Sequence, residues 1–276
     1  MTQTLLPRAG EPGVDHGGHE TCLGCTKRDD AWWAGPALTV LVLTAFSIYA
    51  TWAAFQGEHY YADPYLSPFY SPLLLIKPGV TGGAPADHAW FAGWPEWLPA
   101  FVTPAFFILV FPGSFRLTCY YYRKAYYRSM MASPPACSVS GVAHDYQGEK
   151  RLFLFQNLHR YALYFAIAFI GILYYDAFLA LRKHGQWGVG LGTLVMFLNA
   201  TFLGAFTFGC NSFRHLVGGG LNWYSKHPIR HALWRFVSLL NSRHMELAWI
   251  SLLWVGFTDL YVRLVSMGVI TDPSTW

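Results

Sequence analysis

The sequence Thr21-Cys-Leu-Gly-Cys25-Thr-Lys-Arg-Asp-Asp-Ala-Trp-Trp33 stands directly in front of an apolar run that continues to Phe55. A run of roughly 20 apolar residues is long enough to cross the hydrocarbon core of a bilayer as a helix. Paired tryptophans are typical of the point where a chain enters a membrane. The stretch therefore predicts that the fold begins with a membrane-spanning helix.

The composition of the whole chain also indicates an integral membrane protein. Of its 276 residues, 54% are hydrophobic and 12% are charged, whereas soluble domains carry about 25% charged residues. The net charge of +4 is too small to indicate nucleic-acid binding. Residues 1–27 are polar and glycine-rich and lack the apolar core of a signal peptide. The five cysteines are scattered and do not form the pattern of a disulfide framework.

Five segments are long enough to span a membrane, which predicts an all-α bundle of five transmembrane helices. We expect the prolines of the second segment, Pro99, Pro104 and Pro112, to bend it. An N-terminal arm over residues 1–30 precedes a single transmembrane domain over residues 31–276. The segments run over residues 33–55, 98–122, 158–181, 187–217 and 245–265.

Charge in the connecting loops predicts the orientation of the bundle. The loops over residues 123–157 and 218–243 are rich in Lys and Arg, whereas the loop over residues 56–97 carries only Lys77. Basic loops stay on the cytoplasmic side of a membrane. We therefore expect a cytoplasmic N-terminus and an outside C-terminus. The outer loop is rich in Tyr and Trp, so we expect it to lie along the outer interface as a cap.

The Cys22–Cys25 pair is a candidate metal site. Cys-x-x-Cys spacing lets two thiolates bind one metal from a single turn of backbone. His159, His215 and His244 fall at the inner ends of three different segments, where ionisable groups are expensive without a role. Each histidine alone can also be an ordinary interfacial residue at a helix end. Together they are candidates for the remaining ligands.

Cys119 and Cys210 form a competing pair of thiols. Both lie within apolar segments, where a free cysteine is often only a small buried hydrophobe. Two cysteines and two histidines suit zinc, or a [2Fe–2S] cluster with both histidines on one iron. Two histidines on facing helices would instead suit a b-type haem. The residues by themselves leave these chemistries open.

Polar side chains that could bind a quinone gather in the same inner zone. A quinone carbonyl needs a hydrogen-bond donor, and the reduced form needs protons. Arg or Tyr at a helix end is usually only an interfacial anchor. We expect Glu246, one turn inside the last segment, to pair with Arg243. The candidates are Arg116, Tyr120, Arg123, Tyr126, Ser212, Arg214, Arg243 and Glu246.

Four strings taken together resemble a known family, the haem-less membrane-anchor subunit of mycobacterial succinate dehydrogenase 1, a respiratory complex II. The resemblance extends over essentially the whole chain. The strings are Thr21–Trp33 as quoted above, Cys119-Tyr-Tyr-Tyr-Arg-Lys-Ala-Tyr-Tyr-Arg-Ser129, Ser133-Pro-Pro-Ala-Cys137 and Phe208-Gly-Cys-Asn-Ser-Phe-Arg-His215.

The resemblance implies an anchor in the bacterial cytoplasmic membrane, surrounded by lipid and inactive alone. It would dock a flavoprotein and an iron–sulfur subunit, pass electrons from succinate to menaquinone, and leave room for higher-order assembly. The family further implies a Rieske-type [2Fe–2S] cluster with two cysteine and two histidine ligands. Cys22 and Cys25 are favoured for one iron because they can chelate, and His159 and His244 for the other. His215 is the next candidate.

Two other hypotheses stay open at this point. One is a b-type haem anchor that reacts with quinone. The other is a zinc-binding membrane scaffold or transporter. A transporter needs a polar path across the bundle, and the segments offer little beyond Asp176, Asn199 and Asp259.

Overall fold

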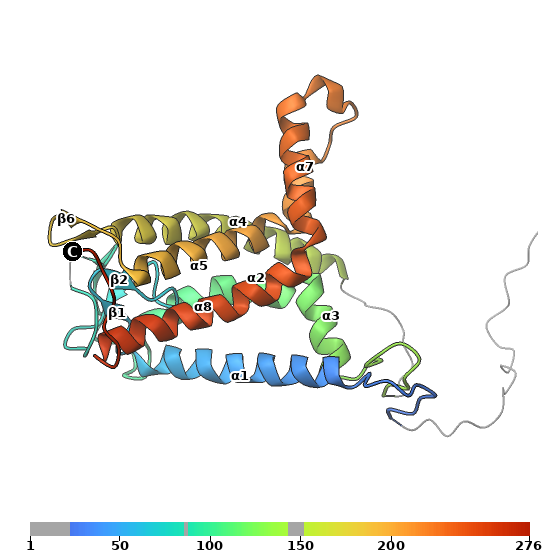
Figure 1. The fold of residues 1–276 in the computed structure, drawn as a ribbon, viewed down its shortest axis with the longest axis horizontal. Helices are drawn as coiled ribbons and strands as arrows, with labels where there is room; N and C mark the ends of the chain where they lie inside the picture. The colour runs from blue at the N-terminus through green and yellow to red at the C-terminus, as the bar shows by residue number, and fades with distance from the viewer. Residues whose placement is uncertain (1–22, 86–87, 143–151) are drawn as a thin grey trace, which may run out of the picture.

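The computed structural model describes residues 23–85, 88–142 and 152–276. Long helices run side by side, and small strand pairs lie together at one end of the bundle (Figure 1). The predicted all-α class is confirmed. The α-helices of the described residues are α1 (Ala34–Gln56), α2 (Pro104–Thr118), α3 (Tyr120–Ser129), α4 (Leu152–Leu179), α5 (Leu191–Phe208), α6 (Asn211–Gly218), α7 (Pro228–Ser242) and α8 (His244–Ser266).

Four of these helices are long and apolar enough to cross a membrane, namely α1, α5, α8 and the Asn157–Leu179 part of α4. The remaining apolar helix, α2, has 15 residues, which is about 22 Å of helical rise. The predicted fifth span is therefore not one continuous helix. In the bundle, α5 packs against both α4 and α8, and α2 packs against α4.

The second predicted segment, residues 98–122, is interrupted at a cysteine. Residues 98–103 form turns and extended chain, and α2 begins at Pro104, whose missing N–H is no loss in a first helical turn. Pro112 lies inside α2 without ending it. Cys119 has an extended backbone, with φ −63° and ψ 128°, and α3 starts at the next residue. The prolines therefore do not set the main break in this segment.

The fourth predicted segment, residues 187–217, is broken in the same way. Cys210 has an extended backbone, with φ −66° and ψ 140°, between α5 and α6. Gly209 allows the chain to come close to α7 there, because a Cβ atom would lie 3.1 Å from the Leu240 carbonyl oxygen. The Asn241 side chain donates a hydrogen bond to the Gly209 carbonyl at 2.7 Å. The last turn of α7 thus fixes the backbone at Gly209, next to the break at Cys210.

The predicted inner loop over residues 218–243 contains a helix that the length of its apolar runs does not predict. It follows a short 3₁₀ turn, η2 (Tyr224–Lys226), and α7 then projects away from the bundle (Figure 1). Its apolar residues Ile229, Leu233 and Phe236 have the i, i+4, i+7 spacing of one helix face. Such an amphipathic helix carries too many polar residues to register as a span.

The outer loop, residues 56–97, folds partly into the end of the bundle. Tyr60 and Tyr70 are fully buried and stack at 4.2 Å between ring centroids, whereas Trp97 is exposed. The Tyr70 hydroxyl donates to the Ala53 carbonyl at 2.8 Å. The loop therefore does not only lie along the interface as a cap, because some of its tyrosines are buried in the bundle. Antiparallel strands β1 (Tyr61–Ala62) and β2 (Tyr65–Leu66), parallel strands β3 (Leu75–Ile76) and β4 (Ala92–Gly93), and the antiparallel hairpin of β5 (Arg182–Lys183) and β6 (Gln186–Trp187) lie near this end.

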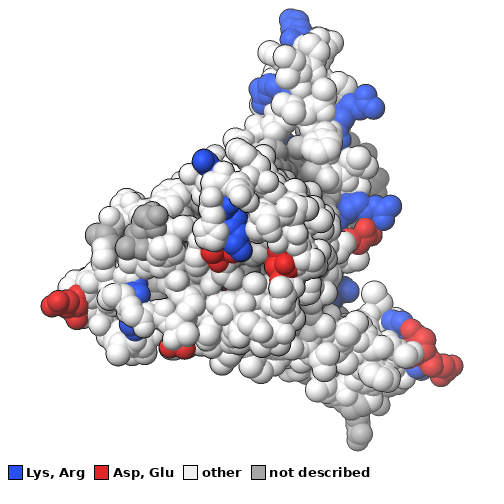
Figure 2. All heavy atoms as spheres, turned by 60° about the vertical axis from the view of Figure 1, so that its left-hand side comes forward, with Lys and Arg blue, Asp and Glu red and all other residues white. Residues whose placement is uncertain are grey.

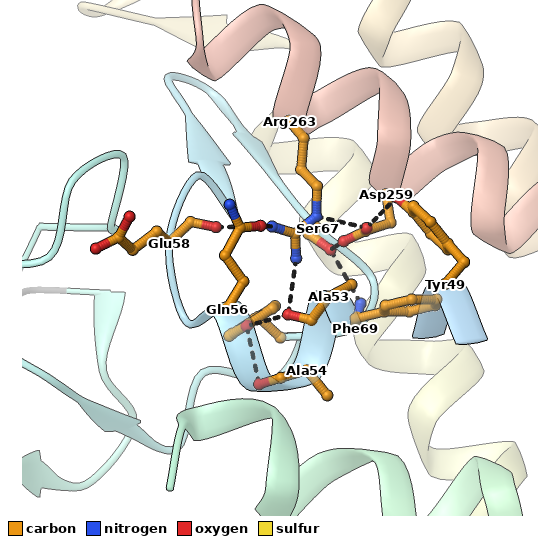
Figure 3. A network of polar contacts seen from close by, with 10 residues as sticks. Tyr49, Ala53, Ala54, Gln56, Glu58, Ser67, Phe69, Asp259 and Arg263 are labelled. Atoms are coloured by element: carbon orange, nitrogen blue, oxygen red, sulfur yellow. Dashed lines mark hydrogen bonds and ion pairs between the residues drawn. The ribbon is translucent and has the colours of Figure 1, made fainter. Parts of the chain in front are cut away.

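A buried ion pair ties the outer loop to α1 and α8. Asp259 and Arg263, one turn apart on α8, are 0% and 1% exposed and meet at 2.7 Å. Figure 3 shows that the carboxylate also accepts hydrogen bonds from Tyr49 of α1 and Ser67 of the loop. The guanidinium donates to Gln56 Oε1 and to the carbonyl oxygens of Ala53 and Glu58. Both charges are thereby compensated inside the protein, as a membrane interior requires.

We expect Asp259→Ala to lower the free energy of unfolding by about 3–5 kcal/mol, because it leaves the Arg263 charge buried without its counter-ion. Thermal or denaturant unfolding of the purified protein in detergent measures the change. Glu246→Ala is the matched control on the same helix. The Arg243–Glu246 pair is exposed and joins residues three apart at 3.1 Å, and such pairs contribute about 0–1 kcal/mol. Equal losses in the two variants would contradict a structural role for the buried pair.

Candidate metal centre

Four side chains that can bind a metal meet at the end of the bundle where α3 and α7 lie. Cys119 stands between α2 and α3, and Cys210 stands between α5 and α6. His159 belongs to α4, and His244 is the first residue of α8. The exposed fractions of Cys119, His159 and Cys210 are 3%, 6% and 4%. These three donors are therefore screened from water, whereas His244 is partly exposed.

The four side chains form two histidine–cysteine pairs. His159 Nε2 lies 3.0 Å from Cys210 Sγ, and His244 Nε2 lies 3.7 Å from Cys119 Sγ. Phe115 stacks on His159 and Phe206 stacks on His244, with centroid separations of 4.6 and 4.8 Å. The two phenylalanine rings also contact each other, 5.6 Å apart. A continuous aromatic wall therefore flanks both pairs.

Both cysteines occupy the position just before a helix begins. The backbone N–H of Ser212 donates to Cys210 Sγ at 3.4 Å. At the other break, the backbone N–H groups of Tyr121 and Tyr122 interact with the Cys119 thiol. Unpaired N–H groups at a helix N-terminus favour negative charge nearby. The two breaks thus place both sulfur atoms where a thiolate is stabilised by the backbone.

Thr118 fixes the orientation of the His159 ring. Its hydroxyl donates to the Ser114 carbonyl at 2.7 Å, and its oxygen lies 2.9 Å from His159 Nδ1. Because the single hydroxyl proton is used on Ser114, the contact with His159 requires a proton on Nδ1. The lone pair of His159 then belongs to Nε2, the atom that faces Cys210. This is the arrangement expected of a histidine that binds a metal through Nε2.

Arg116 brings positive charge to the same region. Its guanidinium donates to Ser251 Oγ at 3.0 Å and to the Tyr122 hydroxyl, and it lies 4.8 Å from the Phe206 ring centroid. The Tyr122 hydroxyl in turn donates to the Ala248 carbonyl at 2.6 Å. This network joins α2, α3 and α8 beside the two pairs. A fixed cation there offsets the negative charge of thiolate ligands.

Two cysteines and two histidines are a donor set that a [2Fe–2S] cluster or a zinc ion can use. Among the described residues, no three His, Cys, Asp or Glu side chains converge on one ion position. A [2Fe–2S] cluster contains two irons, so its four protein ligands need not point at one place. His244 Nδ1 is buried without a hydrogen-bond partner in the described structure. A buried nitrogen of this kind is normally satisfied, which suits a residue that binds a further group.

The structure treats the other predicted ligands differently. Cys22 lies outside the described residues, and Cys25 is disulfide-bonded. The backbone of Cys25 accepts a hydrogen bond from Ser140 at 2.9 Å, beyond α3. His215 is exposed on α6, beside Trp234 of α7. The Cys22–Cys25 pair and His215 stay predicted ligands, whereas His159 and His244 are brought together with Cys119 and Cys210.

A cavity of about 220 Å³ adjoins the aromatic wall. Phe115, Arg116 and Phe206 line it together with apolar residues of α1, α4 and the outer loop, including Phe46, Ile170 and Phe69. The cavity therefore runs from the ring that stacks on His159 toward the strand end of the bundle. Of the eight predicted quinone residues, Arg116 lines this cavity.

The other quinone candidates do not line this cavity, and all of them except the buried Arg123 are at least partly exposed. Tyr120 and Arg123 line a basic hollow on α3, and the Tyr126 hydroxyl donates to the Leu117 carbonyl at 3.3 Å. The Ser212 backbone N–H donates to Cys210 Sγ at the start of α6, and the Arg214 side chain donates to Ser238 Oγ at 3.0 Å. The expected pairing of Glu246 with Arg243 is confirmed at 3.1 Å, in an exposed position. These contacts are those of residues that fix helix ends.

Comparisons with known proteins agree with this architecture. Residues 34–268 match the family described as actinobacterial succinate dehydrogenase subunit SdhC. The chain is also similar to a chain of the Mycobacterium smegmatis Sdh1 complex in the apo form, with 44% identity and a TM-score of 0.82. That match covers 91% of this chain and 94% of the other. A search of curated proteins finds no match.

We expect Thr118→Val to lower the metal affinity of the centre roughly 10–100-fold, because the valine cannot accept the His159 Nδ1 proton. The iron and zinc content of the purified protein, measured after dialysis against a chelator, reports the loss. Thr201→Val is the control, since Thr201 makes the same hydrogen bond to the carbonyl four residues earlier, at 2.8 Å. Unchanged metal retention in Thr118→Val would remove Thr118 from the centre.

Proposed function

This chain belongs to the family of actinobacterial succinate dehydrogenase SdhC subunits, and we propose that it passes electrons to a membrane quinone through a Rieske-type [2Fe–2S] cluster. It is a multi-pass subunit of the cytoplasmic membrane and part of an oxidoreductase. The solved relative is a chain of a complex. We propose that this chain likewise binds the flavoprotein and iron–sulfur subunits, at the end where α3 and α7 lie.

Two histidine–cysteine pairs, whose members come from separate parts of the chain and lie at one end of the bundle, support this proposal. We propose that Cys119, Cys210, His159 and His244 hold the cluster. They replace the Cys22–Cys25 pair, which was favoured on spacing alone. The two breaks supply backbone donors to the sulfurs, and Thr118 orients one imidazole. When bound, such a cluster accepts and donates one electron at a potential higher than that of an all-cysteine cluster.

The contacts of the histidines favour this proposal over haem. A thiol faces the Nε2 atom of each imidazole, the nitrogen that would have to be free for a haem iron. Phe115 and Phe206 fill the space against both rings. Zinc accepts the same donor set. It is therefore the main alternative, and metal analysis separates it from iron.

We propose that α3 and α7 lie on the cytoplasmic side. The connections at that end carry most of the Lys and Arg residues, and cytoplasmic loops of membrane proteins are enriched in these residues. We further propose that the chain crosses the membrane five times, with residues 98–103, α2 and the first turn of α3 together forming the broken second span. A broken helix is tolerated at membrane depth when its backbone groups find partners inside the protein.

We propose that the quinone head group enters the cavity beside Phe115 and Phe206. Arg116 can donate a hydrogen bond to a quinone carbonyl oxygen there. The apolar walls match an isoprenoid tail and keep water away from the reacting oxygen atoms. Reduction to the quinol takes two electrons and two protons, and the electrons derive from succinate oxidation in the partner subunits.

Electron paramagnetic resonance of the reduced complex tests the ligand set. We expect Cys119→Ser, Cys210→Ser, His159→Ala and His244→Ala each to abolish a Rieske-type signal, since each removes one of four ligands. Flavin content and subunit composition report whether each variant still assembles.

Cys22→Ser, Cys25→Ser and His215→Ala are the controls, and we expect them to keep the signal. The reverse pattern would assign the cluster to the N-terminal pair. A strong Soret absorption band would indicate haem, and zinc without iron would indicate a structural site. Any of these three results would refute the proposed cluster.

Filling the cavity tests the quinone site. Gly113 lines the cavity, and a Cβ atom there meets no other atom within 4 Å. We therefore expect Gly113→Leu to fold normally and to reduce succinate:quinone activity about ten-fold or more. Reduction of a soluble dye by the flavoprotein should stay unchanged.

Gly171→Leu is the matched control for this change. Gly171 is also a helical glycine with open space around its Cβ position, but it faces a surface hollow beside Trp90 and Tyr175. We expect it to leave quinone reduction intact. Full activity in Gly113→Leu would place the quinone elsewhere.

A further inference from the structure

A helical hairpin projects sideways from the end of the bundle and buries little of its surface against it. We call residues 211–243, which comprise α6, η2 and α7, the basic arm. In Figure 1 the arm stands across the direction of the long helices, and α7 packs mainly on α6, with smaller contacts to η2 and to the ends of α5 and α8. If the long helices cross a bilayer, the arm runs along the membrane plane, at the depth where the spans end.

The arm is held together from within. Arg230 of α7 donates to the carbonyl oxygens of Val217 and Gly219 at the end of α6, at 2.8 and 3.1 Å. Arg214 of α6 lies over the Trp234 ring of α7, 4.8 Å from its centroid. These contacts satisfy the last carbonyls of α6, which a helix end leaves open. The two helices of the arm therefore hold each other through these contacts.

One face of the arm is apolar and exposed. Ile229, Leu233 and Phe236 follow one another along α7 and are 76%, 50% and 58% exposed. Leu239 and Trp223 extend this stripe and are also exposed. A contiguous apolar stripe of this kind marks an interaction surface. Exposure of this stripe to water costs free energy.

The charge of the arm has one sign. No Asp or Glu occurs between Asp176 and Glu246, whereas the arm contains Arg214, Lys226, Arg230, Arg235 and Arg243. Figure 2 shows Lys and Arg side chains spread along the projecting arm. Lys226 lies 5.6 Å from the Trp223 ring centroid, so a cation borders the apolar stripe. An exposed apolar stripe with basic flanks is the pattern of a helix that lies in a membrane interface.

We propose that the basic arm binds anionic phospholipid, with the apolar stripe in the interfacial layer and Lys226 and Arg235 on the phosphate groups. Its orientation across the spans and its purely basic charge favour a lipid surface over a protein partner. The proposal is independent of the metal centre and of the quinone site. It needs only that the long helices span a membrane.

Hydrogen–deuterium exchange of the complete purified complex in lipid nanodiscs tests the proposal. The probes are nanodiscs of phosphatidylcholine alone and of phosphatidylcholine mixed with phosphatidylglycerol. We expect the α7 amides to exchange at least about five-fold more slowly in the anionic nanodiscs, as each cation near an anionic surface adds roughly that factor in binding. The double variant Lys226→Gln/Arg235→Gln should lose this protection.

Arg182→Gln/Lys183→Gln removes the same charge at the opposite end of the bundle and should keep the protection. Equal protection in neutral and anionic nanodiscs would overturn the anionic preference. Protection that is already complete in detergent would show that a partner subunit covers the arm, and it would overturn the proposal. So would exchange that is fast in every condition.

Discussion

Two helix breaks inside the bundle are the constraint on which the rest of the structure depends. A break in a membrane helix leaves backbone N–H groups without carbonyl partners, and no water is at hand to satisfy them. At Cys119 and Cys210 the sulfur atoms face these N–H groups. The sequence thus places its two buried thiols where the backbone needs an acceptor, and the N–H groups offset part of the cost of a buried thiolate.

The breaks also determine where along the bundle a histidine can reach a cysteine sulfur. His159 and His244 stand where their Nε2 atoms face the sulfurs, and Asn241 of α7 holds the second break from outside the bundle. The opposite end of the molecule has a different task, since the Asp259–Arg263 pair ties the outer loop to two helices. The chain therefore has its four candidate metal ligands at one end and its buried ion pair at the other, with an apolar cavity between them.

Much of this arrangement could be predicted from the sequence. Apolar length predicted the first, third and last spans closely, because a bilayer sets that length directly. His159 and His244 could be predicted as candidate ligands, because an ionisable residue at that depth in a membrane is costly unless it has a function. The cysteine pair was harder, since Cys-x-x-Cys is a local signal, whereas Cys119 and Cys210 are 91 residues apart and meet only through packing of α2, α4 and α5. Thr118 could not be predicted to orient His159, because a hydroxyl on a helix is common in any sequence. The helix α7 could not be predicted as a structural feature, because its amphipathic pattern is equally common.

The position of Asp259 and Arg263 on one helix has a consequence for biogenesis. Each charged residue opposes the entry of a helix into the membrane by about 2.5–3.5 kcal/mol at its centre. Residues four apart can pair as soon as the helix forms, so α8 can leave the translocon as a nearly neutral segment before any neighbour is in place. The partners of this ion pair are synthesised before α8 and are present when α8 docks. They are Tyr49, Ser67 and Gln56. Docking of α8 onto these side chains then completes the buried network that joins α1, α8 and the outer loop.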